Sequence, residues 1–210
     1  MSGYEAEKKE KNMAYDYDGA HDLETPLQAT LGEAIAHGIV VSNLAFFVGK
    51  EMNLSKEDCH SLAIAGMLHD IGKLRLRSYV YEEKKAKLDI DELRYIRMHP
   101  SLGYAILKEH GYPPDVLTAV LYHHENVDGS GYPNNLKGEE IPLNARILRV
   151  CDAFGALITN RPCRSAFDIE TAISIMIEEV KSFDMKIFLA FQKVTQSKDM
   201  KDLLSLMGIH

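Results

Sequence analysis

Apolar residues recur at helical spacing through most of the chain. Between residues 27 and 52 they fall on one face and predict one long helix, at Leu31, Ile35, Ile39, Leu44, Phe47 and Val48. A second helix is predicted to begin after Ser55, where Asp58 follows three positions later as in a capping box, and to end near Gly72. Further helices are predicted over 89–97, 100–111, 113–124 and 144–158, then near 169–182, 185–195 and 199–207.

Two segments depart from this pattern. Residues 1–26 are polar and dotted with tyrosines, which predicts a tail or a short docking segment. Residues 75–87 are charged and follow neither a helical nor a strand period. Because no alternating run indicates a strand, the sequence predicts an all-helical bundle that forms one domain over residues 27–210.

Composition limits the class of protein. A chain of 210 residues with 46% hydrophobic content can bury the core of a single domain. Cys59, Cys151 and Cys163 form no CxxC pair, so we expect reduced thiols. From the sequence we expect no apolar stretch of the roughly 20 residues that span a bilayer, and the N-terminus has no apolar signal core. These features predict a cytoplasmic protein with no membrane contact.

The net charge of -7 argues against a partner that is a nucleic acid polymer. A nucleic-acid-binding surface normally carries a stripe of basic residues. The charge remains compatible with a small phosphorylated ligand, since metal ions and a few arginines can supply positive charge locally.

Histidines adjacent to carboxylates or to a second histidine are the first sign of chemistry. His123 and His124 lead directly into a glycine-rich loop that contains Gly-Tyr-Pro. The His69-Asp70 doublet follows apolar residues at a predicted helix end, so both side chains are expected to point inward. A buried carboxylate needs a partner or a metal. The alternative is a capping histidine beside a surface aspartate.

The Glu33-His37 pair and Asp152 become candidate metal ligands only when they are considered together with the histidines above. Glu33 and His37 are four residues apart on one helix face, which is also common on solvated helix surfaces. Asp152 lies within an apolar helix and needs a partner, and a salt bridge to Arg146 or Arg149 is the alternative to a metal.

Together these positions suggest a polynuclear metal site in the core. The eight candidate ligands are Glu33, His37, His69, Asp70, His99, His123, His124 and Asp152. Nitrogen and oxygen donors in this number suit two or three divalent ions, with iron or manganese preferred over zinc, nickel or magnesium. Because neutral imidazole is the ligand, occupancy is expected to fall below a pH of about 6.5.

The ordered series of motifs resembles the HD-GYP family, a branch of the HD-domain phosphohydrolases whose members hydrolyse the bacterial signalling messenger cyclic di-GMP. The resemblance covers residues 27–195. It rests on Glu33-x-x-x-His37, His69-Asp70-Ile-Gly-Lys73, His99-Pro100-x-x-Gly103, His123-His124-Glu125-x-x-Asp128-Gly-Ser-Gly131-Tyr132-Pro133, Asp152 and Arg161-Pro-x-Arg164.

The resemblance implies a division of the ligands. One ion would be held by His37, His69, Asp70 and Asp152, and Asp70 would bridge to a second ion held by His99, His123 and His124. In the family, a glutamate at the position of Glu33 accompanies a third metal.

The resemblance also implies contacts for substrate. Lys73, Arg161 and Arg164 match positions that contact phosphates or guanines, and Gly131 and Tyr132 line the pocket. Asp70 and Lys73 are the residues expected to act in catalysis. Metal ions can activate water and stabilise charge on phosphate oxygens, so no serine or cysteine nucleophile is needed.

Three departures from the family pattern bear on substrate fit and rate. Gly155 stands where the family usually has an aspartate, so a contact that supports a metal ligand could be missing. Cys163 replaces a common aromatic residue, and the 75–87 segment lacks the usual Ile-Pro and lysine pattern.

The sequence therefore predicts a metal-dependent phosphodiesterase that opens cyclic di-GMP to linear pGpG and onward to GMP. One alternative is a phosphohydrolase for another cyclic dinucleotide or nucleotide. Another is a weakly active module that binds a cyclic dinucleotide or a protein. Control by a regulatory protein partner, by metal redox state or by homodimerisation is left open.

Overall fold

The structure is a computed structural model, and it describes residues 31–82, 96–160 and 164–209. The predicted tail over residues 1–26, most of the helix predicted over 89–97, and Arg161 lie outside the described residues. Among the described residues every regular element is a helix, so the predicted all-helical class is confirmed.

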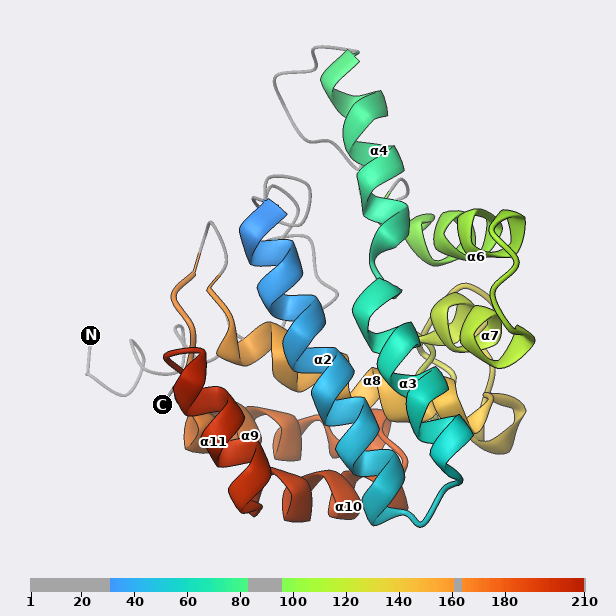
Figure 1. Cartoon of the computed structure of the whole chain (residues 1–210). Coiled ribbons are helices and arrows are strands. Elements are labelled where there is room, and N and C mark those ends of the chain that lie inside the picture. The colour runs from blue at the N-terminus through green and yellow to red at the C-terminus, as the bar shows by residue number, and fades with distance from the viewer. Residues whose placement is uncertain (1–30, 83–95, 161–163, 210) are drawn as a thin grey trace, which may run out of the picture.

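The first helices form a long antiparallel pair with an extension. Helix α2 (Leu31–Glu51) packs along α3 (Lys56–Leu68), and Ser55 caps α3 by accepting a hydrogen bond from the backbone N–H of Asp58 (3.0 Å) (Figure 1). After a two-residue turn, α4 (Ile71–Glu82) continues past the end of α3 and projects from the body of the molecule. The turn between α3 and α4 therefore holds the His69-Asp70 doublet.

The middle of the chain supplies the helices that face this turn. Helix α6 (His99–Glu109) begins with Pro100 in its first turn, and α7 (Pro114–Tyr122) begins at the second proline of the Pro113-Pro114 pair. After a loop with one 3-10 turn, η2 (Gly138–Glu140), the chain enters α8 (Leu143–Ile158). Helix α8 contacts α2, α3 and α7, so it is the central helix of the fold.

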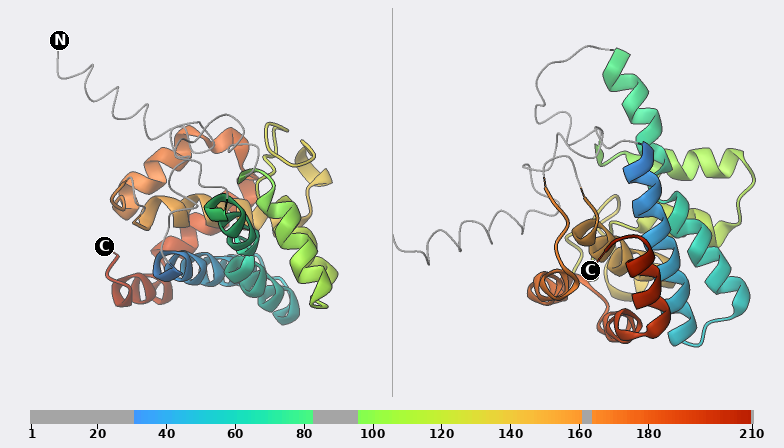
Figure 2. Two further views of the ribbon diagram at one scale, coloured as in Figure 1. Left: turned by 90° about the horizontal axis from the view of Figure 1, so that it is seen from above. Right: turned by 60° about the vertical axis from the view of Figure 1, so that its left-hand side comes forward.

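The C-terminal part of the chain covers the other side of α8. It comprises α9 (Ile169–Glu178), the 3-10 turn η3 (Val180–Ser182), α10 (Met185–Gln196) and α11 (Lys198–Leu206). Helices α9 and α10 pack on α8, and α10 also packs on α2 (Figure 2). The apolar pattern predicted helices near 169–182, 185–195 and 199–207, which correspond to α9 with η3, to α10 and to α11.

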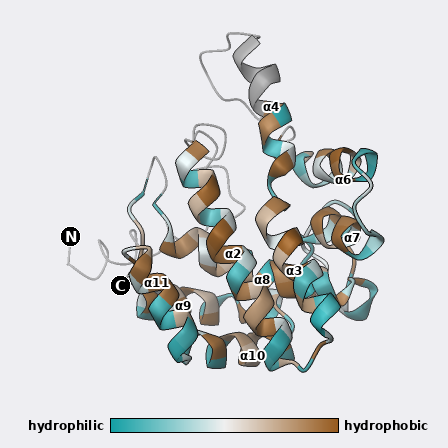
Figure 3. Ribbon diagram, in the orientation of Figure 1, coloured by the Kyte–Doolittle hydropathy of each residue, from teal (hydrophilic) through white to brown (hydrophobic). Residues whose placement is uncertain are grey.

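Apolar side chains from α2, α8 and α10 meet in the core. Val41, Leu44, Phe154 and Phe191 are fully buried there, and Phe154 and Phe191 pack edge to face at 5.0 Å between ring centroids. Figure 3 shows hydrophobic positions along α2 and polar positions on the outer surfaces of α10 and α11. Burial of this face drives the packing of the helices.

Two expectations from the sequence were wrong. Residues 71–82 form α4, so the second helix stops at Leu68 and Gly72 lies inside the following helix. Helix α2 is also long and apolar enough, by length and composition, to cross a membrane. The same helix contributes Val40, Val41 and Leu44 to the folded core, which accounts for its apolar character in a packed domain.

Candidate metal centre

Seven of the eight predicted ligands converge in the interior, at a point where five helices meet. His37 lies within α2 and Asp152 within α8. The others lie at helix ends: His69 and Asp70 after α3, His99 at the start of α6, and His123 and His124 after α7. Three groups of ligand atoms lie close enough to hold an ion: His99, His123 and His124; His37, His69 and Asp70; and His69, His123 and Asp152.

One half of this cluster is organised around Asp152. Its Oδ1 lies 3.0 Å from Nε2 of His37 and 3.3 Å from Nε2 of His69. The two Nε2 atoms are themselves 3.3 Å apart. Arg146 pairs with Asp184, and Nε of Arg149 donates to Asn126. The contacts of Asp152 with two imidazole nitrogens are those of a candidate ligand.

The other half of the cluster is a triad of histidines. Nε2 of His99 lies 3.2 Å from Nε2 of His123 and 3.2 Å from Nε2 of His124. Asp70 joins the two halves, because its Oδ2 lies 3.5 Å from His69 Nε2 and its Oδ1 lies 3.3 Å from His99 Nε2. A carboxylate with one oxygen facing each half is placed to bridge two ions.

Backbone carbonyls fix the rings of three histidines. The Nδ1–H of His69 donates to Gly66 (2.8 Å), that of His99 to Ile96 (2.6 Å) and that of His123 to Val120 (2.6 Å). Each acceptor lies three residues earlier, at the end of the preceding helical turn. A neutral ring that donates from Nδ1 presents a lone pair at Nε2, the form that binds a metal.

This arrangement fits divalent cations. Nε2 of His99 and Nε2 of His123 face each other at 3.2 Å, and each is the lone-pair nitrogen when its Nδ1–H donates to a carbonyl. Two acceptors at that separation repel unless a cation or a proton lies with them. The donors are nitrogen and carboxylate oxygen, which suits iron, manganese or zinc.

Four of the five histidines in the cluster, His37 among them, have a pKa lowered by burial, and only His69 has a raised pKa. Burial holds the pKa of His99 and of His124 well below the usual value, and burial together with the charge on His69 lowers that of His123 to about 4. Burial also lowers the pKa of His69, but Asp70 and Asp152 outweigh it and raise the pKa to about 9. An imidazolium between two carboxylates therefore supplies the positive charge in the metal-free cluster.

Both aspartates are strongly acidic. Burial alone would raise the pKa of Asp70, but the charges of His69, Lys73 and His99 hold it well below its usual range. Hydrogen bonds from His37 and His69 do the same for Asp152 against the effect of burial. Both side chains are therefore carboxylates at neutral pH, as metal ligands must be.

Two motif glycines permit the close packing of α4 on α6. A β-carbon on Gly72 would lie 2.1 Å from the carbonyl oxygen of His99 and 2.8 Å from the backbone nitrogen of Gly103. A β-carbon on Gly103 would lie 3.1 Å from Val120. The glycines of the His69 and His99 motifs thus bring two ligand-bearing helix ends together.

The loop after the histidine pair folds back onto it. A β-carbon on Gly131 would lie 2.3 to 2.5 Å from backbone atoms of residues 124–126, so this position admits only glycine. The buried carboxylate of Glu125 accepts hydrogen bonds from the backbone N–H groups of Asn134 (2.6 Å) and Leu136 (3.0 Å). Glu125, to which the sequence pattern assigned no role, therefore secures the loop.

An aromatic side chain from this loop and a cationic one from the segment before α6 lie beside the cluster. The ring of Tyr132 stacks on His124 with centroids 4.7 Å apart and an interplanar angle of 21°. Arg97 is an exposed residue of the segment before α6. Its guanidinium carbon lies 5.3 Å from the centroid of the Tyr132 ring. Arg97 was missed from the sequence, because a single arginine before His99 has no distinguishing spacing.

The remaining predicted site residues lie in different settings. Nζ of Lys73 donates to Asp70 Oδ2 at 2.7 Å, so this cation adjoins the cluster. The guanidinium of Arg164 donates to the carbonyls of Ala156 (2.8 Å) and Leu157 (3.2 Å) at the end of α8, and its substrate role stays a prediction. Arg161 lies outside the described residues.

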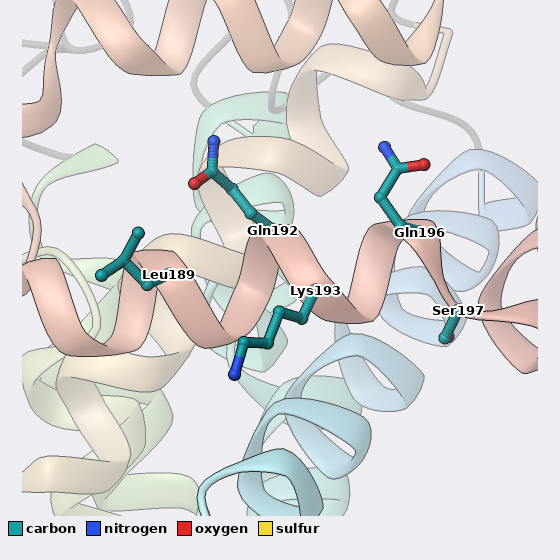
Figure 4. A pocket seen from close by; sticks show the side chains of 5 residues that line it. All are labelled: Leu189, Gln192, Lys193, Gln196 and Ser197. Atoms are coloured by element: carbon teal, nitrogen blue, oxygen red, sulfur yellow. The ribbon is translucent and has the colours of Figure 1, made fainter.

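Glu33 lies one helical turn from His37 but in none of the three groups of ligand atoms. It lines a cavity between the start of α2, the end of α8 and the C-terminal residues 207–209. The involvement of Glu33 in a third metal stays a prediction. A separate hollow on the outer surface of α10 is lined by Leu189, Gln192, Lys193, Gln196 and Ser197 (Figure 4). That lining has no histidine or carboxylate.

Comparison with known proteins gives concordant matches. The family model for the HD domain matches residues 21–187. The cyclic di-GMP phosphodiesterase response regulator RpfG of Xanthomonas campestris is 37% identical over 138 residues, which cover 65% of this chain and 36% of RpfG. The 3'3'-cGAMP-specific phosphodiesterase 3 of Vibrio cholerae is 34% identical over 173 residues, which cover 82% of this chain and 36% of that protein.

A solved structure shares the fold. The cyclic GMP-AMP specific phosphodiesterase V-cGAP3 of V. cholerae superposes with a TM-score of 0.65 at 19% identity, over 85% of this chain and 48% of that one. The chain spans about a third of the length of the two curated relatives described above.

Proposed function

The chain belongs to the HD domain family, and we propose that it is a metal-dependent phosphodiesterase that hydrolyses cyclic di-GMP to linear pGpG and onward to GMP. The convergence of five histidines and two aspartates in one cluster carries this proposal. RpfG, which is named as a cyclic di-GMP phosphodiesterase, aligns with 65% of this chain and supports cyclic di-GMP as the substrate.

We propose that the cluster holds two or three divalent ions, with iron or manganese preferred. His37, His69 and Asp152 would hold one ion, and His99, His123 and His124 a second. Asp70 would bridge them, since its two oxygens face the two halves. Glu33 is the candidate for the third ion. Bound ions would activate a water molecule and stabilise charge on the phosphate oxygens.

The protein itself would orient the substrate for hydrolysis. The oxygen of water forms a bond to phosphorus, the bond from phosphorus to the ribose 3'-oxygen breaks, and the leaving oxygen takes a proton. Lys73, held against Asp70, would place positive charge beside the reacting phosphate. Tyr132 would line the pocket for a base, and Gly131 allows the loop to fold close to the cluster. Arg161 and Arg164 remain proposed contacts for phosphates or guanines.

A second candidate substrate is 3'3'-cGAMP. The relative named for that substrate aligns with 82% of this chain. The ligands of a metal centre contact phosphate and water, so they do not discriminate between guanine and adenine. Discrimination would depend on residues around the cluster, such as Tyr132.

The test is turnover by protein loaded with iron or manganese without oxygen. Cyclic di-GMP, 3'3'-cGAMP and the simple diester bis(p-nitrophenyl) phosphate would be incubated separately, and the products separated by chromatography. We expect pGpG and then GMP from cyclic di-GMP. Turnover of the simple diester alone would refute the dinucleotide assignment. Tight binding of cyclic di-GMP without product, at full metal occupancy, would favour a binding module.

We also propose a domain organisation, a location and a mode of regulation. The catalytic domain would comprise residues 27–210, with residues 1–26 as a tail or docking segment. Reduced thiols support a cytoplasmic location, because free Cys59 and Cys151 are both buried. Regulation by a protein partner or by homodimerisation would be detected by the mass of the protein in solution with and without cyclic di-GMP.

A further inference from the structure

The five histidines of the cluster are not supported equally. Three of them donate from Nδ1 to a backbone carbonyl three residues earlier. Nδ1 of His37 and Nδ1 of His124 are buried and have no hydrogen-bond partner among the residues that the structure describes. The ring of His124 is instead covered by Tyr132, which stacks on it. His37 is therefore a candidate ligand that has neither an acceptor at its outer nitrogen nor a stacked tyrosine over its ring.

The reason lies on the facing helix. Gly155 of α8 packs against His37, and a β-carbon built on it would lie 3.4 Å from Nδ1 and 3.3 Å from Cε1 of that ring. The missing side chain points at the nitrogen that lacks an acceptor. An oxygen attached to such a β-carbon would lie within hydrogen-bonding range of Nδ1.

An acceptor at this position matters to a metal ligand. A hydrogen bond from the outer ring nitrogen fixes the orientation and tautomer of the imidazole and makes Nε2 a stronger donor. His37 lies within α2, and no carbonyl of that helix accepts a hydrogen bond from its Nδ1, whereas His69 finds its acceptor in the preceding turn.

We propose that the metal site formed by His37 and Asp152 binds its ion more weakly than the histidine triad does, because residue 155 is a glycine. An oxygen supplied at residue 155 would raise the affinity of that site. The inference rests on the proposed metal centre but not on the identity of the substrate. Gly155 is a positioning residue here, because it acts through His37 and would touch neither the ion nor the substrate.

The test is titration of the metal-free protein with Mn²⁺ in competition with a chromogenic chelator. The wild-type protein should show a tight and a weak ion. Gly155→Asp and Gly155→Ser should raise the affinity for the weak ion about 10-fold to 100-fold, the range known for such supporting contacts. Gly155→Ala, which adds the same β-carbon as serine but no oxygen, is the matched control and should give no rise.

Steric strain is controlled separately. A β-carbon at residue 155 would lie 2.9 Å from Cγ2 of Val41, so the same substitutions would also be made in a Val41→Ala background. The gain should disappear when His37→Ala is combined with Gly155→Asp.

Three outcomes would overturn the inference: equal affinities in the aspartate, serine and alanine variants, a gain that persists without His37, or a gain in the tight ion. Because these titrations contain no substrate, a failure of the phosphodiesterase proposal would leave their result intact. Turnover of cyclic di-GMP with unchanged Mn²⁺ affinities would refute the inference alone.

Discussion

Asp152 Oδ1 lies 3.0 Å from Nε2 of His37, although 115 positions separate the two residues along the chain. The contact joins α2 and α8, which pack together in the core. Because the same oxygen also lies 3.3 Å from Nε2 of His69, one carboxylate holds two imidazoles in place. The packing of α2 on α8 in the core therefore also brings these two ligands together.

The first prediction concerns this carboxylate. Asp152→Asn keeps the side-chain shape but removes the charge that faces His37 and His69. We expect loss of one ion and at least a 100-fold loss of turnover. The metal-free protein should lose about 3 kcal/mol of unfolding free energy at neutral pH, since the His69 imidazolium loses a buried partner. Elemental analysis and urea unfolding measure both effects. The exposed Asp202→Asn is the control and should change neither.

The second prediction concerns pH and the stability of the metal-free protein. His69 has a pKa of about 9 in the folded state against about 6.5 in the unfolded state, so its contribution is complete below about pH 6.5 and is lost toward pH 9. His99, His123 and His124 have lowered pKa values, so stability also falls as the pH drops below about 6.5.

We therefore expect maximum stability of the metal-free protein near pH 6.5 on account of these groups. Urea unfolding in a chelator across pH 5 to 9 measures the profile. His69→Gln should flatten its alkaline side and only reduce the acidic side, because the His69 charge helps to lower the pKa of His123 while burial lowers it independently. An unchanged alkaline side in that variant would contradict the assignment of the raised pKa to His69.

The third prediction concerns Glu125. Glu125→Ala removes the acceptor of two backbone N–H groups and should lower the unfolding free energy by about 1 to 3 kcal/mol. Released from its anchor, the loop should also hold Tyr132 less firmly on His124, so KM for cyclic di-GMP should rise. Glu139→Ala, an exposed glutamate of the same loop, is the matched control. If both variants behave alike, the carboxylate of Glu125 does not secure the loop.

The fourth prediction concerns Arg97. The guanidinium carbon of Arg97 lies 5.3 Å from the centroid of the Tyr132 ring, and a guanidinium held over an aromatic ring can still use its N–H groups to bind phosphate or a guanine edge. Arg97→Ala should raise KM for cyclic di-GMP about tenfold, equivalent to about 1.4 kcal/mol. Hydrolysis of bis(p-nitrophenyl) phosphate should be unchanged, since that diester is too small to reach beyond Tyr132. Lys108→Ala removes another cation that lies over a tyrosine, Tyr104, and serves as the control.

The sequence predicted the helices with the strongest apolar period and the residues of the cluster, and its recognition of the family is confirmed by the match to the HD domain. Periodicity predicted α2, which buries one apolar face, and the long apolar run predicted α8, which is buried on every side from Ile147 to Ile158. It missed α4, because Leu74 and Arg75 are exposed and the start of this helix is fixed by the contact of Gly72 with His99. That contact is tertiary, so local spacing could not reveal it.

The parts of the site that the sequence missed also depend on tertiary contacts. Glu125 is next to His124 in the chain, but its partners lie 9 and 11 residues away in a loop whose path no periodicity describes. The absence of an aspartate at Gly155 was visible from the sequence. Its effect on His37 could be inferred only from the folded structure, which places residue 155 of α8 against the ring of His37 on α2. The roles of the individual site residues stay predictions until they are tested by substitution.

Three imidazoles of the cluster are oriented by their own helices. His69, His99 and His123 each use a carbonyl from the preceding turn. The rotational entropy of these rings is therefore lost when the helices form and not when an ion arrives. An arriving ion meets rings that already have their final orientation, so more of its interaction energy is retained as affinity.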